Sequence, residues 1–225
     1  MAMREPDGLL AVGGDLSPAR LIAAYGRGIF PWFSDGEPIL WWSPDPRCVF
    51  VPGEVRVSRR LARTLRSGRF EIRVDTAFDQ VIAGCAAPRS YTAQTWITSD
   101  MVRAYRRLFD LGVAHSIEAW RDGELAGGLY GLSIGRAFFG ESMFSAQRDA
   151  SKVLLAHLGG HLEKQGFGLI DCQVASAHLL SLGAALLPRA SFLRALGPLC
   201  EAKAPEGTWE PGRILPVPER YRALQ

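Results

Sequence analysis

The stretch HSIEAWRDGELAGGLYGLSIGRAFFGESM, residues 115–143, decides the fold that we expect for this chain. Over 115–120, 124–133 and 136–143 the residues follow a period of two, which is the pattern of β-strands. Arg121-Asp122-Gly123 and Gly135 separate these segments, and such residues favour tight turns. The pattern therefore predicts an antiparallel meander of three strands.

Helical and extended segments surround the meander. A helix is predicted over about 150–165, ended by Gly166, and a strand over 168–174 follows it. Further helices are predicted over 18–25, 59–66, 75–85, 99–111, 177–182 and 190–196, and a strand over 70–74. Ser58 is the expected N-cap of the helix over 59–66. Meander, helix and strand in this order are typical of α+β proteins. The proline-rich residues 204–225 are expected to run extended over the surface.

The bulk composition is that of an ordinary globular protein. The chain has 225 residues, 48% hydrophobic and 22% charged, which is enough for one large domain or for a small and a medium one. Every apolar run is far shorter than the roughly 20 residues of a membrane span, so we expect no transmembrane helix and no membrane partner. The start MAMREPDG lacks the apolar region of a secretory signal, and the four cysteines form no CxxC pair. These features predict a cytoplasmic protein with free thiols.

Positive charge is concentrated in one segment. The net charge is only +3, too small to identify a nucleic-acid binder, but 56–73 holds seven arginines against one acid, Glu71. Arg59, Arg63 and Arg66 share the outer face of the helix expected there. This face fits the phosphates of a nucleic acid, and an ordinary solvated helix face is the alternative.

Several standard catalytic devices are missing. His157 and His161 are four residues apart on an expected helix, but no glutamate base lies between them and no third ligand is evident, so we predict no metal site. The chain has no GxSxG motif, no evident Cys/His pair and no phosphate-binding loop with its lysine. Covalent catalysis and nucleotide hydrolysis are therefore not supported.

Two carboxylates interrupt segments that otherwise read as buried. Asp171 stands in LIDCQV, residues 169–174, and Glu141 in FFGESMF, residues 138–144. Burying either one without a partner would cost several kcal/mol, so they either cap turns and pair with arginines or serve a function. On a strand, Asp171 and Gln173 would point to the same face. There the carboxylate could orient the Gln173 amide in a cleft that binds an amine nucleophile.

These residues also carry a family resemblance. The chain resembles the bacterial leucyl/phenylalanyl-tRNA-protein transferases, in collinear order from Arg4 to Arg189. The matching strings are REPDGLLAVGGDLSPARL (4–21), YGRGIFPWFSDGEPILWWSPDPR (25–47), TWIT (95–98), AYRRLFDLGVAHSIEAW (104–120), GESMFS (140–145), ASKVLL (150–155), LIDCQV (169–174) and HLLSLGA (178–184). Each string alone is weak evidence, whereas the collinear set is highly specific.

The resemblance implies an activity and an architecture. It implies a cytoplasmic enzyme that moves Leu or Phe, and less readily Met, from aminoacyl-tRNA to proteins with N-terminal Arg or Lys, which marks them for degradation. It also implies a small N-terminal domain, which we expect over 1–55, and a GNAT-like acyltransferase domain over 56–225 with a mainly antiparallel sheet flanked by helices. We expect a monomer without cofactor or metal. An aminoacyl ester is already activated, so alignment alone could lower the barrier by about 7–11 kcal/mol.

The resemblance also implies roles for the two motifs. Asp171 orients Gln173, whose amide oxygen receives or relays a proton from the attacking amine, and Glu141 holds an amino group. Because a neutral amide is a feeble base, we regard Gln173 more as a positioner, with the ribose 2′-OH of the donor as a possible relay.

Binding residues follow from the same resemblance. The Leu or Phe side chain would lie in an apolar pocket built by Trp96, Met143, Ile170, Leu158 and Leu162. The terminal adenosine would lie near Tyr25, Trp32 and Tyr105, where stacking contributes about 1–3 kcal/mol per base. The tRNA backbone would contact Arg59, Arg63 and Arg66.

Two other functions compete with this prediction. An acyl-CoA-dependent N-acetyltransferase of GNAT type would share the architecture, but it needs a glycine-containing pyrophosphate loop at its helix start, and residues 147–152 read QRDASK. A noncatalytic RNA-binding module would account for the arginines and tryptophans. It would leave Glu141, Asp171 and Gln173 without a role.

Overall fold

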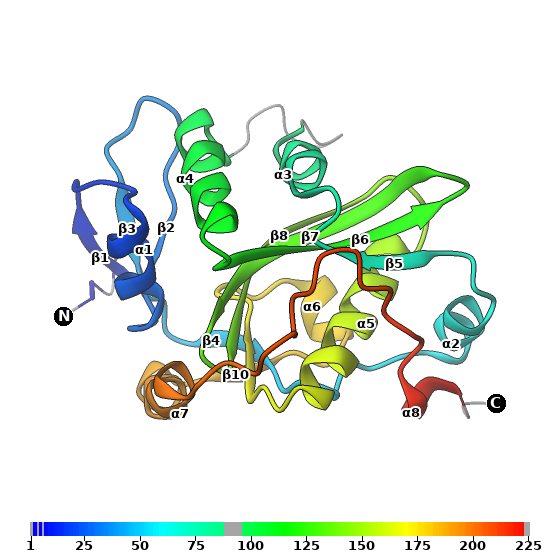
Figure 1. The fold of residues 1–225 in the computed structure, drawn as a ribbon. Helices are drawn as coiled ribbons and strands as arrows, with labels where there is room; N and C mark the ends of the chain where they lie inside the picture. Colours follow the sequence, from blue (N-terminus) through cyan, green and yellow to red (C-terminus); the bar gives the residue numbers. More distant parts are fainter. Residues whose placement is uncertain (1, 4, 6, 88–95, 223–225) are drawn as a thin grey trace.

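The computed structural model describes residues 2–3, 5, 7–87 and 96–222, which form two β-sheets with helices around them (Figure 1). Within these residues the larger sheet has seven strands in the order β10-β4-β9-β8-β7-β6-β5. They are β4 (Arg47–Phe50), β5 (Glu71–Val74), β6 (Ala114–Arg121), β7 (Glu124–Ile134), β8 (Ala137–Ser145), β9 (Leu169–Asp171) and β10 (Ala185–Leu187). The β8/β9 pair is parallel and the other pairs are antiparallel. The protein is therefore a mixed α/β structure with a mainly antiparallel sheet.

The predicted meander is confirmed as β6, β7 and β8. Leu129 of β7 lies opposite Ile117 of β6 on one side and Met143 of β8 on the other. The β6–β7 turn consists of Asp122 and Gly123, both with positive φ (52° and 82°), the backbone that a two-residue hairpin turn requires. This meander forms the centre of the sheet on which the other elements pack.

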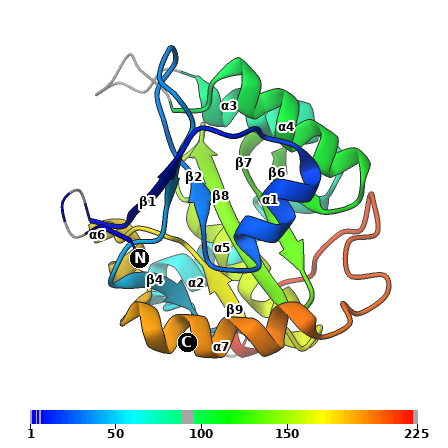
Figure 2. The same cartoon turned by 90° about the vertical axis from the view of Figure 1, so that its left-hand side faces the viewer.

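Helices cover both faces of the large sheet (Figures 1 and 2). On one face lie α3 (Phe78–Ala86) and α4 (Ser99–Asp110), and on the other lie α5 (Ala150–Lys164), α2 (Arg59–Arg66) and α6 (Ala177–Ser181). Successive side chains of β8 point to opposite faces of the sheet. Phe138 packs on the face that α5 covers, and Phe139 packs on the face that α3 and α4 cover. The predicted N-cap of α2 is confirmed, since the Ser58 hydroxyl accepts a hydrogen bond from the Leu61 amide.

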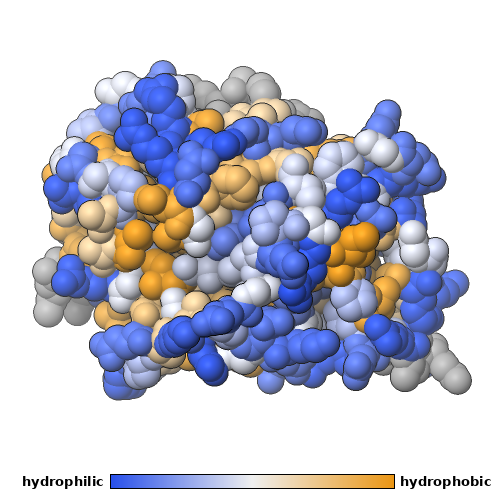
Figure 3. All heavy atoms as spheres, viewed as in Figure 1, coloured by the Kyte–Doolittle hydropathy of each residue, from blue (hydrophilic) through white to orange (hydrophobic). Residues whose placement is uncertain are grey.

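A small sheet precedes the large one. Its strands are β1 (Leu9–Val12), β3 (Leu40–Trp42) and β2 (Phe30–Pro31), in that spatial order, and α1 (Pro18–Tyr25) packs beside them. In Figure 3, hydrophobic residues gather over this part of the surface, whereas hydrophilic residues cover α7 (Arg189–Glu201). The small sheet shares one hydrophobic cluster with α3 and α4. The chain then enters the large sheet at β4, ahead of the expected domain boundary at residue 55.

The C-terminal segment is more tightly bound than the expected extended tail. The Gly212 and Leu215 amides donate to the carbonyls of Val74 and Ile72, which prolongs the sheet beyond β5. Trp209 packs on Phe138 with a ring separation of 5.3 Å. A short helix, α8 (Glu219–Arg222), follows. The tail is thus part of the core on the α5 side.

Other differences from the sequence prediction are local. The expected strand over 168–174 ends at Asp171, because Gln173 has a φ of 55° and leaves the strand. Helix α3 begins at Phe78 and not at Asp75, whose carboxylate accepts from the Ser116 amide at 2.6 Å. No bounds were predicted for β4, β10 or the three strands of the small sheet. Within the described ranges, no helix is long and apolar enough to cross a membrane.

Candidate active site

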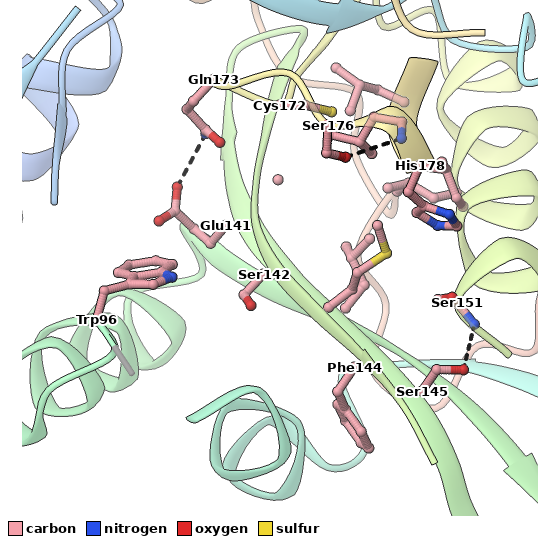
Figure 4. Close-up of a pocket in the computed structure, with 17 residues that line it drawn as sticks. Trp96, Glu141, Ser142, Phe144, Ser145, Ser151, Cys172, Gln173, Ser176 and His178 are labelled. Atoms are coloured by element: carbon pink, nitrogen blue, oxygen red, sulfur yellow. Dashed lines mark hydrogen bonds between the residues drawn. The ribbon is translucent and has the colours of Figure 1, made fainter. Parts of the chain in front are cut away.

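A cleft of about 530 Å³ opens between β8, α5 and the segment that joins β9 to α6 (Figure 4). Glu141 and Gln173 lie close together at one end of it. Its apolar lining comes from Trp96, Leu129, Met143, Phe144, Leu155, Leu158, Ile170 and Leu179. A polar pair beside an apolar wall suits a ligand that carries an amino group and an apolar side chain.

Glu141 reaches the cleft because β8 bulges at this residue. Ser142 pairs with Tyr130 and Gly140 pairs with Gly131, so Glu141 is an extra residue without a partner on β7. A bulge of this kind bends the strand and redirects a side chain. Gly131 permits the close approach, since a Cβ atom there would lie 2.1 Å from the Phe139 carbonyl oxygen. The bulge explains how a carboxylate can interrupt an otherwise buried strand.

Two tyrosines hold the Glu141 carboxylate. The Tyr25 hydroxyl donates to Oε1 at 2.7 Å and the Tyr105 hydroxyl donates to Oε2 at 2.8 Å, and the two hydroxyls also contact each other. Burial raises the pKa of Glu141 from its usual 4.5 to about 7, although the two tyrosine hydrogen bonds oppose this rise. Glu141 can therefore exchange a proton near neutral pH.

Asp171 lies behind the cleft in a buried ion pair. Its two oxygens accept from Nε and Nη2 of Arg47 at 2.8 and 2.7 Å, and neither side chain is exposed. Arg47 also donates to the Gly28 carbonyl at 3.0 Å and lies between the rings of Phe30 and Phe192. The sequence left open whether Asp171 pairs with an arginine. The structure shows this pairing, with Arg47.

Asp171 contacts Gln173 differently from the geometry expected on a strand. Its Oδ1 accepts from the Gln173 main-chain amide at 2.9 Å, and the two residues do not share one face of a strand. The Gln173 carbonyl in turn accepts from the Cys48 amide at 3.1 Å. These bonds fix Gln173 in its left-handed backbone conformation, and its side-chain Nε2 then lies 3.5 Å from Oε1 of Glu141 (Figure 4). The three expected catalytic residues are neighbours, but only Glu141 and Gln173 line the cleft.

The apolar wall contains four of the five residues expected for the aminoacyl side chain. Trp96, Met143, Leu158 and Ile170 line the cleft, whereas Leu162 is fully buried and does not. Leu162 lies one turn beyond Leu158 on α5, too deep to contact a ligand in the cleft. Three further lining residues, on α5 and after β9, were not predicted from the sequence: Leu155, Leu179 and Cys172. Helical spacing from Leu158 would have found Leu155.

Cys172 lines the cleft but does not offer a nucleophile. Burial raises the pKa of its thiol well above the usual range, and the nearby Cys48 and Asp171 act in the same direction. The thiol therefore remains protonated at neutral pH. This state agrees with a site that works by alignment.

The aromatic residues expected to hold an adenosine occupy two environments. Tyr25 and Tyr105 have no exposed surface, and their rings pack against Phe139 and Tyr130. A base cannot stack on these rings, so the expectation for both is corrected: they support Glu141. Trp32 is 44% exposed and lies beside Trp42, with 5.9 Å between ring centroids. Trp96 lines the cleft, but Thr95, which begins the TWIT string, lies outside the described residues.

The arginines expected to contact tRNA lie outside the cleft. Arg59, Arg63 and Arg66 are exposed on α2, and Arg66 donates to the Tyr221 carbonyl at 3.2 Å. The two helical histidines have main-chain partners, since His157 Nδ1 lies 2.9 Å from the Val153 carbonyl and His161 Nε2 lies 2.9 Å from that of Thr208. Within the described ranges, no three His, Cys, Asp or Glu side chains are grouped as metal ligands.

The fold and the cleft together define a class of protein: a mixed α/β protein with a cleft in which two polar side chains, Glu141 and Gln173, adjoin an apolar wall. Comparison with known proteins gives the family. The family model described as leucyl/phenylalanyl-tRNA protein transferase matches residues 49–197, and the model of that family's N-terminal domain matches residues 14–45. The chain belongs to the leucyl/phenylalanyl-tRNA protein transferase family.

Curated relatives match nearly the whole chain. The leucyl/phenylalanyl-tRNA–protein transferase of Aromatoleum aromaticum is 59% identical over 208 residues, which cover 92% of this chain and 88% of the relative. The protein of the same name from Nitrosomonas eutropha is 56% identical and covers 92% and 89%. That of Alkalilimnicola ehrlichii is 57% identical over 215 residues and covers 95% and 83%.

Proposed function

We propose that this protein transfers Leu or Phe, and less readily Met, from aminoacyl-tRNA to the α-amino group of proteins that begin with Arg or Lys. The transfer forms a peptide bond and marks the acceptor for degradation. The observation that carries the proposal is the cleft in which Glu141 and Gln173 adjoin an apolar wall, in a chain of this family. The wall would take the side chain of the donated residue, and the polar end would hold the reacting amine.

The reaction needs alignment and one proton acceptor. The acceptor nitrogen forms a bond to the ester carbonyl carbon, the carbon–oxygen bond to the ribose breaks, and the amine proton ultimately passes to the released ribose oxygen. Glu141, with its pKa near 7, holds the neutral acceptor amine through the carboxylate and takes up the proton that the amine loses as its nitrogen bonds to the ester carbon. Gln173 orients the reacting groups through its amide, and the buried Arg47–Asp171 pair keeps Gln173 in place. The ribose 2′-OH remains available as a relay to the leaving oxygen.

An acyl-CoA donor fits less well. An N-acetyltransferase would bind a pyrophosphate on free amides at the start of α5, but Asp149 occupies that start with its side chain only 10% exposed. The Ser151 amide is also engaged, since it donates to the Ser145 hydroxyl at 3.3 Å. A noncatalytic RNA-binding module would give the cleft no role.

Finer features belong to the same proposal. The order of meander, α5 and β9 supports a GNAT-like domain, and entry of the chain into the large sheet at β4 supports a boundary near residue 45 in place of 55. We propose a cytoplasmic monomer that needs neither cofactor nor metal. Sedimentation of the purified protein tests whether it is a monomer.

One assay tests the proposal. The protein is incubated with Phe-tRNA or Leu-tRNA labelled in the amino acid, together with a peptide that begins with Arg or Lys. We expect label in the peptide, and none with a peptide whose α-amine is acetylated. A folded sample that leaves all label on the tRNA would sink the proposal, and transfer from acetyl-CoA alone would favour the N-acetyltransferase.

The α2 arginines should contribute to tRNA affinity. Arg59→Ala and Arg63→Ala together should weaken tRNA binding and reduce the slope of log K against log salt by about 0.9 for each lost phosphate contact in the duplex stem. Arg107→Ala is the matched control, because Arg107 is an exposed arginine on α4. Binding measured at several salt concentrations decides the matter, and equal slopes for parent and double variant would refute the role.

A further inference from the structure

A second pocket adjoins the cleft. It has a volume of about 370 Å³ and lies between the segment before α2, α2 itself, the start of α5 and the end of α6. The two cavities share α5 and α6: Ser151 lines the cleft and the next residue, Lys152, lines the pocket. Figure 4 shows Ser151 and His178 at the side of the cleft where α5 and α6 lie. The pocket therefore lies between the cleft and α2.

Three cations from separate elements line this pocket. Arg56 precedes α2, Arg60 lies on α2 and Lys152 on α5, and the single carboxylate among the lining residues is Asp149. Asp149 lies 3.2 Å from Arg60 and 3.9 Å from Lys152. Its φ of 69° lies in the left-handed region of the backbone, which Asp tolerates better than most residues. Asp149 thus holds two of the cations in place, and the lining keeps two net positive charges.

Arg56 is the least compensated of these cations. Its main-chain amide donates to the Leu182 carbonyl at 2.7 Å, which anchors the residue beside the end of α6. The stem of the side chain lies against Gly183, where an added Cβ would be 3.0 Å from Cγ of Arg56. The side chain is exposed, and among the described residues no carboxylate pairs with it. Its guanidinium is therefore available to an anion.

We propose that this pocket binds a phosphodiester of the single-stranded 3′ end of the donor tRNA, which rests on the function proposed above. The amino acid esterified to the terminal adenosine occupies the cleft, so the next nucleotides must leave across its mouth. The pocket lies on the path from that mouth to the exposed arginines of α2. An RNA backbone on this path would pass from one cationic side chain to the next. Arginine binds phosphate oxygens through two parallel hydrogen bonds.

The binding test uses a short RNA and not the whole donor. The trinucleotide CpCpA carries two phosphodiesters, and adenosine carries none. We expect Arg56→Gln combined with Lys152→Gln to weaken binding of CpCpA about tenfold and to reduce its salt slope by about 0.7 per lost contact, the value for single strands. Adenosine binding should not change. Arg194→Gln, which removes an exposed arginine of α7, should leave both ligands unaffected.

Transfer kinetics give an independent readout. With Phe esterified to CpCpA as donor, the double variant should raise KM about tenfold at unchanged kcat, whereas with Phe esterified to adenosine both variant and parent should behave alike. Equal losses with both donors, or unchanged CpCpA binding in a variant that melts like the parent, would overturn the phosphate site. Inorganic phosphate that binds the parent without competing with CpCpA would do the same. CpCpA binding is measured without transfer, so failure of the proposed reaction is distinguishable from failure of this site.

Discussion

Asp171→Asn is expected to lower the free energy of unfolding by about 3–5 kcal/mol and to remove most of the transfer activity. The substitution leaves Arg47 as a fully buried charge without a counter-ion, and a broken buried pair costs roughly this amount. It also weakens the acceptor that holds the Gln173 amide at 2.9 Å. Thermal and denaturant unfolding measure the first effect, and kcat at a temperature where the variant is folded measures the second.

A double variant separates stability from positioning. Replacing both partners, as in Arg47→Met with Asp171→Leu, removes the buried charge, so most of the lost stability should return. Turnover should stay low, because the introduced leucine side chain cannot accept the hydrogen bond from the Gln173 amide. If Asp171→Asn instead melted like the parent and still lost turnover, Asp171 would act directly in the chemistry and would not be a positioning residue.

The secondary structure was largely predictable where short-range physics decides it. The period-two pattern of 115–143 gave the meander, and Ser58 marked the start of α2 correctly. The strands β4 and β10 were missed because they have only four and three residues, too short to show a period. The early end of β9 depends on Gln173, whose left-handed backbone is held by the Asp171 carboxylate and the Cys48 amide. No local pattern signals such a conformation.

The site was predictable in its residue types and less so in its contacts. Glu141 and Asp171 stood out because each interrupts an apolar segment. Arg47, the partner of Asp171, is 124 positions away in the sequence and could not be chosen among many arginines. Tyr25 was assigned to a base because an aromatic ring suits stacking, but the direction of a ring depends on packing. The core encloses that ring and leaves its hydroxyl to Glu141.

Glu141→Gln should reduce transfer about 10²- to 10⁴-fold and change the pH dependence of what remains. In the parent, two groups must lose a proton: Glu141, with its pKa raised to about 7 mainly by burial, and the acceptor α-amine, which titrates near 7.7–8.0. The rate should therefore rise through both values. The pH–rate profile of the variant should keep only the inflection that belongs to the acceptor α-amine. A pH–rate profile of kcat/KM with an arginine-initiated peptide measures this, and an inflection near pH 7 that persists in the variant would contradict the role of Glu141.

The same carboxylate should contribute more to the free energy of unfolding in acid than in base. Because its folded pKa lies above the usual 4.5, the protonated form favours folding, so this contribution is complete below pH 4.5 and is lost as the pH rises through 7. Glu141→Gln should therefore melt no lower than the parent at pH 8, although it is far less active. Tyr105→Phe is the matched control: it removes a hydrogen bond that lowers the pKa of Glu141, so the inflection should move to higher pH. An opposite shift would show that the tyrosine hydroxyls do not stabilise the ionised carboxylate.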